Sequence, residues 1–455
     1  MRRLGPALEV RDFRLWWLAW LSMGVSLQMI EVAIGWEVYA QHRSALDLGW
    51  IGLAEFVPML VLALPAGQLA DRVPRRTILV MAMLLGAGVG VGLALVSSAG
   101  VASVLPYLAL AVGAGISTAL ATPAARALPP TLVRPELLQS AMTLRSIAGQ
   151  GSQVVGPALG GLLYDTSSVL VYLLAAGWCL VACGCVLAMR PAAAATAPMQ
   201  APTAVQAPAG TAPAQRAAAA PAASPESVLD GLRFVRRTQV LLGAILLDLI
   251  AVLFGGVVAL LPIFARSILH VGAGGLGVLR AAPAIGALLA AVLITRRPIG
   301  GRAGRLLLTV VAIYGVSIVV FGFSRLFPLS LAALAVSGFV DLYSMNIRST
   351  TVAIATPDRL RGRVNAVEMV FISGSNELGA FESGVAAYLV GTVPAVVGGG
   401  VLTIAFALSW RRLFPALARV DRLESLAPPE PVPDAHAPPA PAPDAHAPPG
   451  PAVAT

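Results

Sequence analysis

Long apolar runs recur along the whole chain and dominate its pattern. About twelve stretches of roughly 18–25 mostly uncharged residues follow one another, and each is long enough to cross a bilayer as a helix. They fall into two sets of six, separated by a stretch rich in Ala and Pro. The pattern predicts an all-α membrane protein with twelve transmembrane helices in two six-helix bundles.

The ends of the apolar runs place the predicted helices to within a few residues. The first six are Leu15–Tyr39, Leu48–Ala70, Thr77–Val96, Val101–Leu120, Leu138–Leu163 and Ser168–Met189. The second six are Val240–Ala265, Gly274–Thr295, Arg305–Phe323, Phe327–Ile347, Val364–Val390 and Pro394–Phe414.

Composition and charge change this picture little. Hydrophobic residues make up 57% of the 455 residues, charged residues only 12%, and the mean hydropathy is +0.82. A soluble domain carries roughly 25% charged residues, so the composition argues against a soluble enzyme. The net charge of +9 arises from arginine, since the chain has no lysine, and the arginines lie in short loops between apolar runs. Their placement argues against nucleic acid as a partner.

Arginines mark one side of the predicted protein. They follow helices two, four, eight and ten and end helix twelve: Arg72, Arg75, Arg76, Arg126, Arg134, Arg296, Arg297, Arg302, Arg359, Arg361, Arg363, Arg411 and Arg412. Because short cytoplasmic loops carry an excess of basic residues, both termini are predicted to be cytoplasmic. The richness in Ala, Gly, Pro and Arg suggests a bacterial chain, which places it in the inner membrane.

The chain divides into five predicted parts. Residues 1–190 and 239–414 form the two bundles, residues 191–225 an Ala/Pro-rich cytoplasmic linker, and residues 415–455 a disordered Pro/Ala-rich tail. Residues 226–238 have an amphipathic pattern, which predicts a helix at the cytoplasmic membrane surface. Pro135-Glu136 and Pro357-Asp358 precede helices five and eleven, which are equivalent helices of the two halves. Their positions indicate duplication of a six-helix unit.

The loop after helix two carries the strongest motif, Gly67-Gln68-Leu69-Ala70-Asp71-Arg72-Val73-Pro74-Arg75-Arg76. Its three arginines alone would suit a membrane anchor or a lipid-phosphate site. The loop resembles the signature of the major facilitator superfamily, with Pro74 at the place of a usual glycine. The resemblance implies a cytoplasmic latch between the halves, formed by Asp71 and Arg72 with Gly67, Arg75 and Arg76 around them.

Helix five contains Gly156-Pro157-Ala158-Leu159-Gly160-Gly161. Glycines and proline in a membrane helix permit close packing and bending. The segment resembles the antiporter motif of the superfamily, with Ser152 at the place of an earlier glycine, and implies export rather than uptake. The arginine that many proton antiporters carry in helix four is Ala109 here. Any proton coupling must therefore use carboxylates elsewhere.

Two further segments narrow the resemblance within the superfamily. Ser373–Gly384 in helix eleven and Val32–Tyr39 in helix one resemble the enterobactin-exporter-like branch of transmembrane secretion transporters. That branch also includes exporters of macrolides and other drugs, so the resemblance does not name a substrate.

Ionisable and polar groups within the apolar runs are the candidates for binding substrate or protons, because charges inside a bilayer are costly and usually functional. They are Glu31, Glu37, Glu55, Arg145, Asp248, Arg280, Asp341, Arg348, Asn376, Glu377 and Glu382. One or two of the carboxylates are predicted to exchange protons, since burial favours the neutral form of a carboxyl. The alternative is that several form fixed ion pairs that lock helices together.

These observations favour a proton-driven exporter of a small organic molecule, such as a siderophore, another secondary metabolite or a drug. The alternatives are a lysophospholipid flippase and a non-transporting membrane scaffold or sensor. No phosphate-binding loop for ATP is present, and no enzymatic role or cofactor is expected.

The three cysteines, Cys179, Cys183 and Cys185, share one apolar run and are interpreted as packing residues rather than a metal or redox site. The protein is expected to be a monomer in the bilayer.

Overall fold

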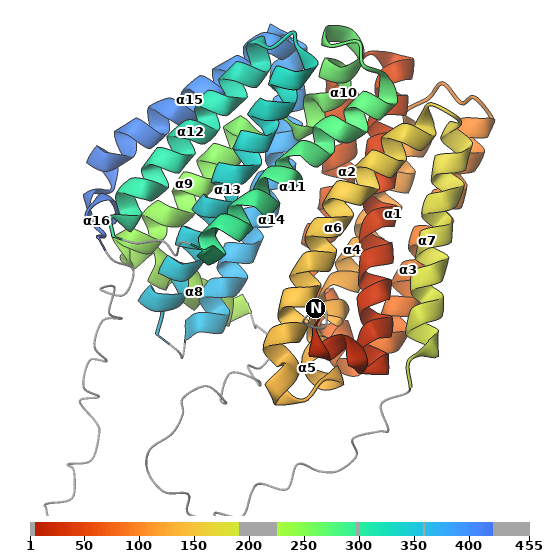
Figure 1. The fold of residues 1–455 in the computed structure, drawn as a ribbon, viewed down its shortest axis with the longest axis horizontal. Helices are drawn as coiled ribbons and strands as arrows, with labels where there is room; N and C mark the ends of the chain where they lie inside the picture. The colour runs from red at the N-terminus through yellow and green to blue at the C-terminus, as the bar shows by residue number, and fades with distance from the viewer. Residues whose placement is uncertain (1–4, 191–224, 297–300, 358–359, 422–455) are drawn as a thin grey trace, which may run out of the picture.

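The computed structural model describes residues 5–190, 225–296, 301–357 and 360–421. Throughout these residues the regular structure is helical, without a strand (Figure 1). The predicted linker up to residue 224 and the tail after residue 421 lie outside the described residues.

The first half begins with a short 3-10 helix and contains six long helices. Its elements are η1 (Pro6–Glu9), α1 (Arg11–His42), α2 (Ala45–Arg72), α3 (Arg75–Ser98), α4 (Leu105–Ala127), α5 (Pro129–Leu132), η2 (Pro135–Leu137), α6 (Leu138–Tyr164) and α7 (Ser168–Ala188).

The second half repeats this plan after an additional helix, α8. Its elements are α8 (Pro225–Arg237), α9 (Gln239–Gly255), η3 (Val258–Leu260), α10 (Leu261–Ile263), η4 (Phe264–Ile268), α11 (Gly272–Arg296), α12 (Ala303–Phe323), α13 (Phe327–Ala355), α14 (Arg361–Val390), α15 (Thr392–Leu413) and α16 (Pro415–Ala418).

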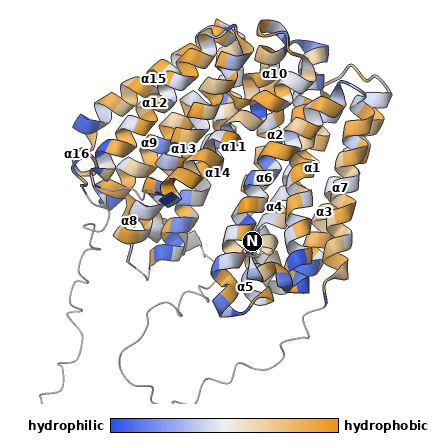
Figure 2. Ribbon diagram, viewed as in Figure 1, coloured by the Kyte–Doolittle hydropathy of each residue, from blue (hydrophilic) through white to orange (hydrophobic). Residues whose placement is uncertain are grey.

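Ten helical stretches of the described chain are long and apolar enough to cross a membrane. The two remaining long helices, α6 and α14, have 27 and 30 residues but carry more polar side chains (Figure 2). Both lie where the two halves meet, α6 beside α11 and α14 beside α2. Together with these two helices, the count agrees with the twelve helices expected from the sequence.

The seventh predicted helix, Val240–Ala265, is not continuous. Helix α9 ends at Gly255, the backbone turns at Gly256 with ψ 83°, and the segment resumes through η3 and α10 into η4, a π-helix. Hydroxyl groups satisfy carbonyls at the break: Tyr314 donates to the oxygen of Gly255 at 3.1 Å and Ser383 to that of Gly256 at 2.8 Å. A broken helix is tolerated at membrane depth only where such partners replace the lost bonds.

The halves converge at one end of the molecule and spread apart at the other (Figure 1). We call these the α10 end and the α8 end. A buried apolar cluster at the α10 end joins them: Val32, Tyr39 and Leu48 of the first half pack with Leu261, Leu276 and Leu279 of the second. Other clusters lie within a single half, so the shared apolar contact is concentrated at the α10 end.

Helix α8 packs against the second bundle. Val235 is buried in a cluster with Leu241, Ile245, Val352 and Val364, and a methyl group at Gly231 would lie 2.8 Å from the carbonyl oxygen of Arg363. Part of its apolar face therefore contacts α9 and α14. A position at the membrane surface stays a prediction for the rest of this helix.

Candidate functional site

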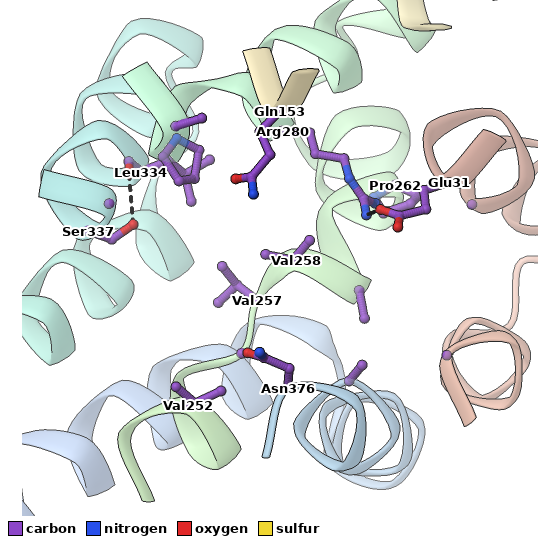
Figure 3. Close-up of a pocket in the computed structure, with 18 of the residues that line it drawn as sticks. Glu31, Gln153, Val252, Val257, Val258, Pro262, Arg280, Leu334, Ser337 and Asn376 are labelled. Atoms are coloured by element: carbon purple, nitrogen blue, oxygen red, sulfur yellow. Dashed lines mark hydrogen bonds and ion pairs between the residues drawn. The ribbon is translucent and has the colours of Figure 1, made fainter. Parts of the chain in front are cut away.

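A cavity of about 620 Å³ lies between the two halves. Helices α1, α2 and α6 line it from the first half, and the segment from α9 to α14 lines it from the second (Figure 3). The broken segment contributes Gly256, Val257, Val258 and Ala259. Pockets of roughly 300–1,000 Å³ are typical for small organic ligands.

One ion pair crosses from half to half at the cavity wall. The carboxylate of Glu31 on α1 accepts a hydrogen bond from the guanidinium of Arg280 on α11 (Figure 3). Both side chains retain about a fifth of their exposure, 20% for Glu31 and 18% for Arg280. Because both residues also line the cavity, a bound molecule can contact the same groups that hold the halves together.

Asp341 on α13 also lines the cavity and is exposed there. Among the residues that the structure describes, it has no ion-pair partner. The phenol of Tyr314 lines the same cavity, but its hydroxyl proton is directed to Gly255. Asp341 is therefore a carboxylate available to whatever enters the cavity.

The rest of the lining mixes amides with apolar side chains. Gln28, Gln153 and Asn376 offer amide groups, and Figure 3 shows Gln153 and Asn376 on separate sides of the space. The apolar surface comes from Ile34, Val252, Val257, Val258, Ile318 and Leu334. Such a surface accommodates an organic molecule with an apolar body and a few polar groups.

The predicted antiporter motif lies where α6 packs between α1 and α11. An added Cβ at Gly160 would lie 3.0 Å from the Cα of Met29 on α1. At Gly161 it would meet the carbonyl oxygen of Ala273 and the backbone of Gly277 on α11, while the carbonyl of Pro157 faces Gly277. Gly156 likewise faces Val25 and Gln28 of α1. The motif thus permits backbone contact between the halves.

Polar contacts add to this junction at the α10 end. The carboxylate of Asp165, just after α6, accepts hydrogen bonds from the backbone N–H groups of Ala273 (3.3 Å) and Gly274 (3.1 Å) in the first turn of α11. The hydroxyls of Tyr39 and Ser267 lie 2.9 Å apart. The guanidinium of Arg266 lies 5.5 Å from the ring centre of Trp36. Each of these contacts joins α1 or α6 to η4 or α11.

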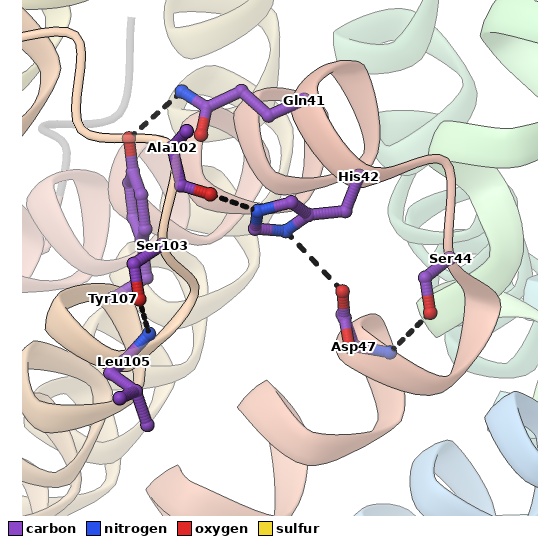
Figure 4. Close-up of polar contacts among 8 residues, drawn as sticks. All are labelled: Gln41, His42, Ser44, Asp47, Ala102, Ser103, Leu105 and Tyr107. Carbon is purple, nitrogen blue, oxygen red and sulfur yellow. Dashed lines mark hydrogen bonds and ion pairs between the residues drawn. The ribbon is translucent and has the colours of Figure 1, made fainter.

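A separate polar cluster braces the first half at the same end. The ring of His42 contacts the carbonyl oxygen of Ala102 at 2.6 Å and the carboxylate of Asp47 at 3.3 Å (Figure 4). The amide of Gln41 donates to the hydroxyl of Tyr107 at 3.2 Å. These contacts join the corner between α1 and α2 to the loop before α4 and to the first turn of α4, within one half.

The predicted site residues separate into those that line the cavity and those that lie elsewhere. Glu31, Arg280, Asp341 and Asn376 come together at the cavity, with Glu55 beside them. Glu37 is buried inside the first half and accepts a hydrogen bond from the hydroxyl of Tyr172 at 2.6 Å. Arg145 lies 6.0 Å from the ring centre of Trp20. Glu382 on α14 is half-buried and does not line the cavity, and the side chain of Glu377 lies outside the described residues.

A second ion-pair network lies inside the second half. Arg348 on α13 pairs with Asp248 on α9, and its Nε lies 3.6 Å from the carboxylate of Glu368 on α14. Arg348 and Asp248 are buried. The network joins three helices of one bundle, which is the fixed-pair role that the sequence left open for Asp248 and Arg348.

The predicted latch is described only in part. The side chains of Asp71 and Arg72 lie outside the described part of the chain, as does the packing around Gly67, although all three residues belong to α2. Arg75 donates to the carbonyl oxygen of Ala127 at 3.1 Å, and Arg76 donates to that of Leu187. These two arginines thus bind the ends of α4 and α7 in their own half, and a latch at Asp71 and Arg72 stays a prediction.

Sequence reasoning missed several residues of the site. Gln28, Gln153, Tyr314 and Ser337 line the cavity, and nothing in the one-dimensional pattern distinguishes them from other polar residues in the helices. Glu368 was overlooked because it follows the arginines near the start of helix eleven. Asp165 lies in a loop, although its position before a Ser167 helix cap marks it as a turn residue.

Comparison with known proteins agrees with the fold and the motifs. A family model described as a transmembrane secretion effector matches residues 4–437. The enterobactin exporter EntS of Citrobacter koseri is 27% identical over 429 residues, which cover 93% of this chain and 95% of that protein. EntS of Escherichia coli O139:H28 is 27% identical over 361 residues, covering 78% of this chain and 80% of that protein.

Solved structures of transporters share the fold. The nucleoside transporter NupG superposes with a TM-score of 0.66 at 12% identity, over 90% of this chain and 99% of that chain. An inward-facing bacterial homologue of the lysosomal transporter Spinster gives a TM-score of 0.63 at 17% identity, over 89% and 98%. At such identities the likeness concerns the fold alone. The family match confirms the resemblance inferred from the loop after helix two, and the chain therefore belongs to the transmembrane secretion effector family of the major facilitator superfamily.

Proposed function

We propose that this protein exports a small organic molecule across the bacterial inner membrane by alternating access of its two halves. The observation that carries the proposal is the Glu31–Arg280 ion pair, which lines the central cavity and joins α1 to α11. A substrate that contacts Glu31 or Arg280 changes the strength of the ion pair that joins the halves. Binding is thereby coupled to the movement that exposes the cavity to the other side.

The orientation follows from the arginines. The α8 end carries the arginine-rich loops, including Arg75, Arg76 and Arg134, and is the cytoplasmic end under the positive-inside rule. In that orientation the halves are joined on the outer side and spread on the cytoplasmic side. The cavity is then in position to receive a molecule from the cytoplasm.

Protons are the proposed driving ion, and Asp341 is the proposed site of proton exchange. Asp341 is exposed to the cavity and lacks an ion-pair partner among the described residues, whereas Asp248 and Glu31 are each paired with an arginine. A carboxylate without a fixed cation can take up and release a proton without breaking an ion pair. Proton antiport would use this exchange to drive export.

A siderophore or similar secondary metabolite is the leading substrate, because relatives across most of the chain are named enterobactin exporters. The direct experiment compares small molecules inside cells and in the medium, with and without the gene, under iron limitation. We expect a compound that accumulates inside cells lacking the protein and returns to the medium with the intact protein. Asp341→Asn should not restore its release.

The alternatives predict different results in the same experiment. A lysophospholipid flippase would change the lipid distribution between leaflets and leave soluble metabolites unchanged. A scaffold or sensor would change neither. Unchanged metabolites together with unchanged drug sensitivity would therefore contradict the export proposal.

A further inference from the structure

We propose that the cavity selects organic cations, and that the exported molecule carries a positively charged group, such as a protonated amine, that binds the carboxylate of Asp341. This inference rests on the proposed export function and specifies the substrate class of its cavity. An amine-bearing siderophore would satisfy it together with the proposed function.

The charges that line the cavity favour a cation. Three carboxylates, those of Glu31, Glu55 and Asp341, line it together with one guanidinium, that of Arg280. Glu31 already compensates Arg280. An anionic group would therefore meet an arginine that is already paired and the carboxylate of Asp341, whereas a cation finds a complementary charge at Asp341.

The cation nearest to Asp341 along its own helix is engaged elsewhere. Arg348 lies seven positions later on α13, about two helical turns. It pairs with Asp248, and its Nε lies 3.6 Å from the carboxylate of Glu368. Two other titratable groups lie near Asp341. Tyr314 is a phenol that donates to the carbonyl of Gly255, and Asp248 is an acid that is paired with Arg348. No described residue forms an ion pair with Asp341, so the cavity can supply its positive partner, as a proton or as a substrate.

The size and the lining of the cavity suit an organic cation better than an inorganic one. A metal ion requires several oxygen ligands at close range, and the described residues contain no cluster of three or more such side chains. The cavity is about 620 Å³, and Val252, Ile318 and Leu334 supply apolar surface. Asn376 and Gln153 add hydrogen-bonding groups from separate sides (Figure 3). The site therefore suits a cationic group on an apolar body.

The test uses two ions of the same shape and opposite charge, tetraphenylphosphonium and tetraphenylborate. The purified full-length protein is heated in detergent with increasing amounts of each ion, and ligand binding is measured as the rise in unfolding midpoint. We expect saturable stabilisation by the phosphonium and none by the borate. Asp341→Asn should raise the half-saturating phosphonium concentration by about tenfold or more, the effect of losing one contact to a charged group.

Two variants control the measurement. Asp341→Glu keeps the charge and should retain phosphonium binding, which separates loss of charge from loss of fold. Asp421→Asn removes an exposed carboxylate of the same half, where the backbone oxygen rather than the side chain accepts a hydrogen bond from Ala303, and should leave binding unchanged.

The inference is overturned if the phosphonium fails to stabilise the protein, if Asp341→Asn binds it as well as the unaltered protein does, or if the borate stabilises instead. The metabolite comparison remains an independent test of export. A released compound without phosphonium binding would leave export standing and overturn the cation assignment. Phosphonium binding through Asp341 without any released compound would support the site and contradict export.

Discussion

Glu31 on α1 and Arg280 on α11 form an ion pair that joins the two halves of the protein at the wall of its central cavity. The other contacts between the halves at the α10 end are backbone contact, apolar packing and polar contacts such as that of Asp165 with α11, and Asp165 does not line the cavity. The pair is the place where a charged molecule in the cavity can act on the junction. It therefore connects what the cavity binds with how the halves are held.

Neutralising one partner of this pair should impair transport. Glu31→Gln or Arg280→Gln leaves an uncompensated charge at a partly buried site, which is expected to lower the rate of export by about tenfold or more. Exchanging the charges, with Glu31→Arg and Arg280→Glu together, should recover part of the rate. The measurement is efflux from cells or proteoliposomes at equal protein amounts. A double variant no better than the single variants would show that the pairing itself is unimportant.

The backbone contact at Gly161 should be required for closure of the α10 end. A methyl group there would meet the backbone of Ala273 and Gly277, so Gly161→Ala should separate α6 from α11. Gly149→Ala is the matched control, because a methyl group at that position of the same helix meets nothing within 4 Å. We expect Gly161→Ala to abolish most transport while the protein still folds. Gly149→Ala should transport at close to the rate of the unaltered protein.

The separation can be measured directly at the α10 end. Arg43 and Arg325 are exposed in loops of opposite halves at this end and can be replaced by cysteine and spin-labelled, once Cys179, Cys183 and Cys185 are removed. Gly161→Ala should lengthen the distance between the labels relative to Gly149→Ala. An identical distance distribution in both would contradict the packing argument.

The fold could be predicted from the sequence because each long helix corresponds to one continuous apolar run. The break at Gly256 was not, because Val240–Ala265 is apolar apart from Asp248 and hydropathy does not show where a backbone hydrogen bond is lost. Gly255-Gly256 and Pro262 were the available signals for this break. Its stability depends on hydroxyls from Tyr314 and Ser383, which lie far away in the chain.

The candidate site was predicted as a list of charges but not as an arrangement. Glu31 and Arg280 were identified separately, and because they lie 249 positions apart in the chain, their pairing depends on how the two halves pack. Asp248 and Arg348 entered the same list, although they form an internal pair away from the cavity lining. Sequence thus shows which residues are costly to bury, while only the packing separates those that brace a bundle from those that face a substrate.

The cap that Asp165 provides to α11 should stabilise the closed α10 end. Helix caps contribute about 0.5–2 kcal/mol, so Asp165→Ala should raise the ratio of molecules open at this end by roughly 2- to 30-fold. The spin-label pair at positions 43 and 325 reports the change as growth of a longer distance. Asp47→Asn, which alters an acid bound to His42 within one half, should not change the distribution. Equal distance distributions for Asp165→Ala and the unaltered protein would show that the cap does not stabilise the closed α10 end.

The network around Arg348 should serve the stability of the second half. Removing one partner of a buried ion pair typically costs about 3–5 kcal/mol, so Arg348→Met, which leaves Asp248 and Glu368 without their cation, should lower the unfolding midpoint markedly. Adding Asp248→Asn and Glu368→Gln to that variant removes the stranded charges and should restore most of the midpoint. Thermal unfolding in detergent measures the midpoint of the single variant and that of the triple variant. If the triple variant is as unstable as Arg348→Met alone, the instability arises from lost packing at Arg348 and not from its unpaired carboxylates.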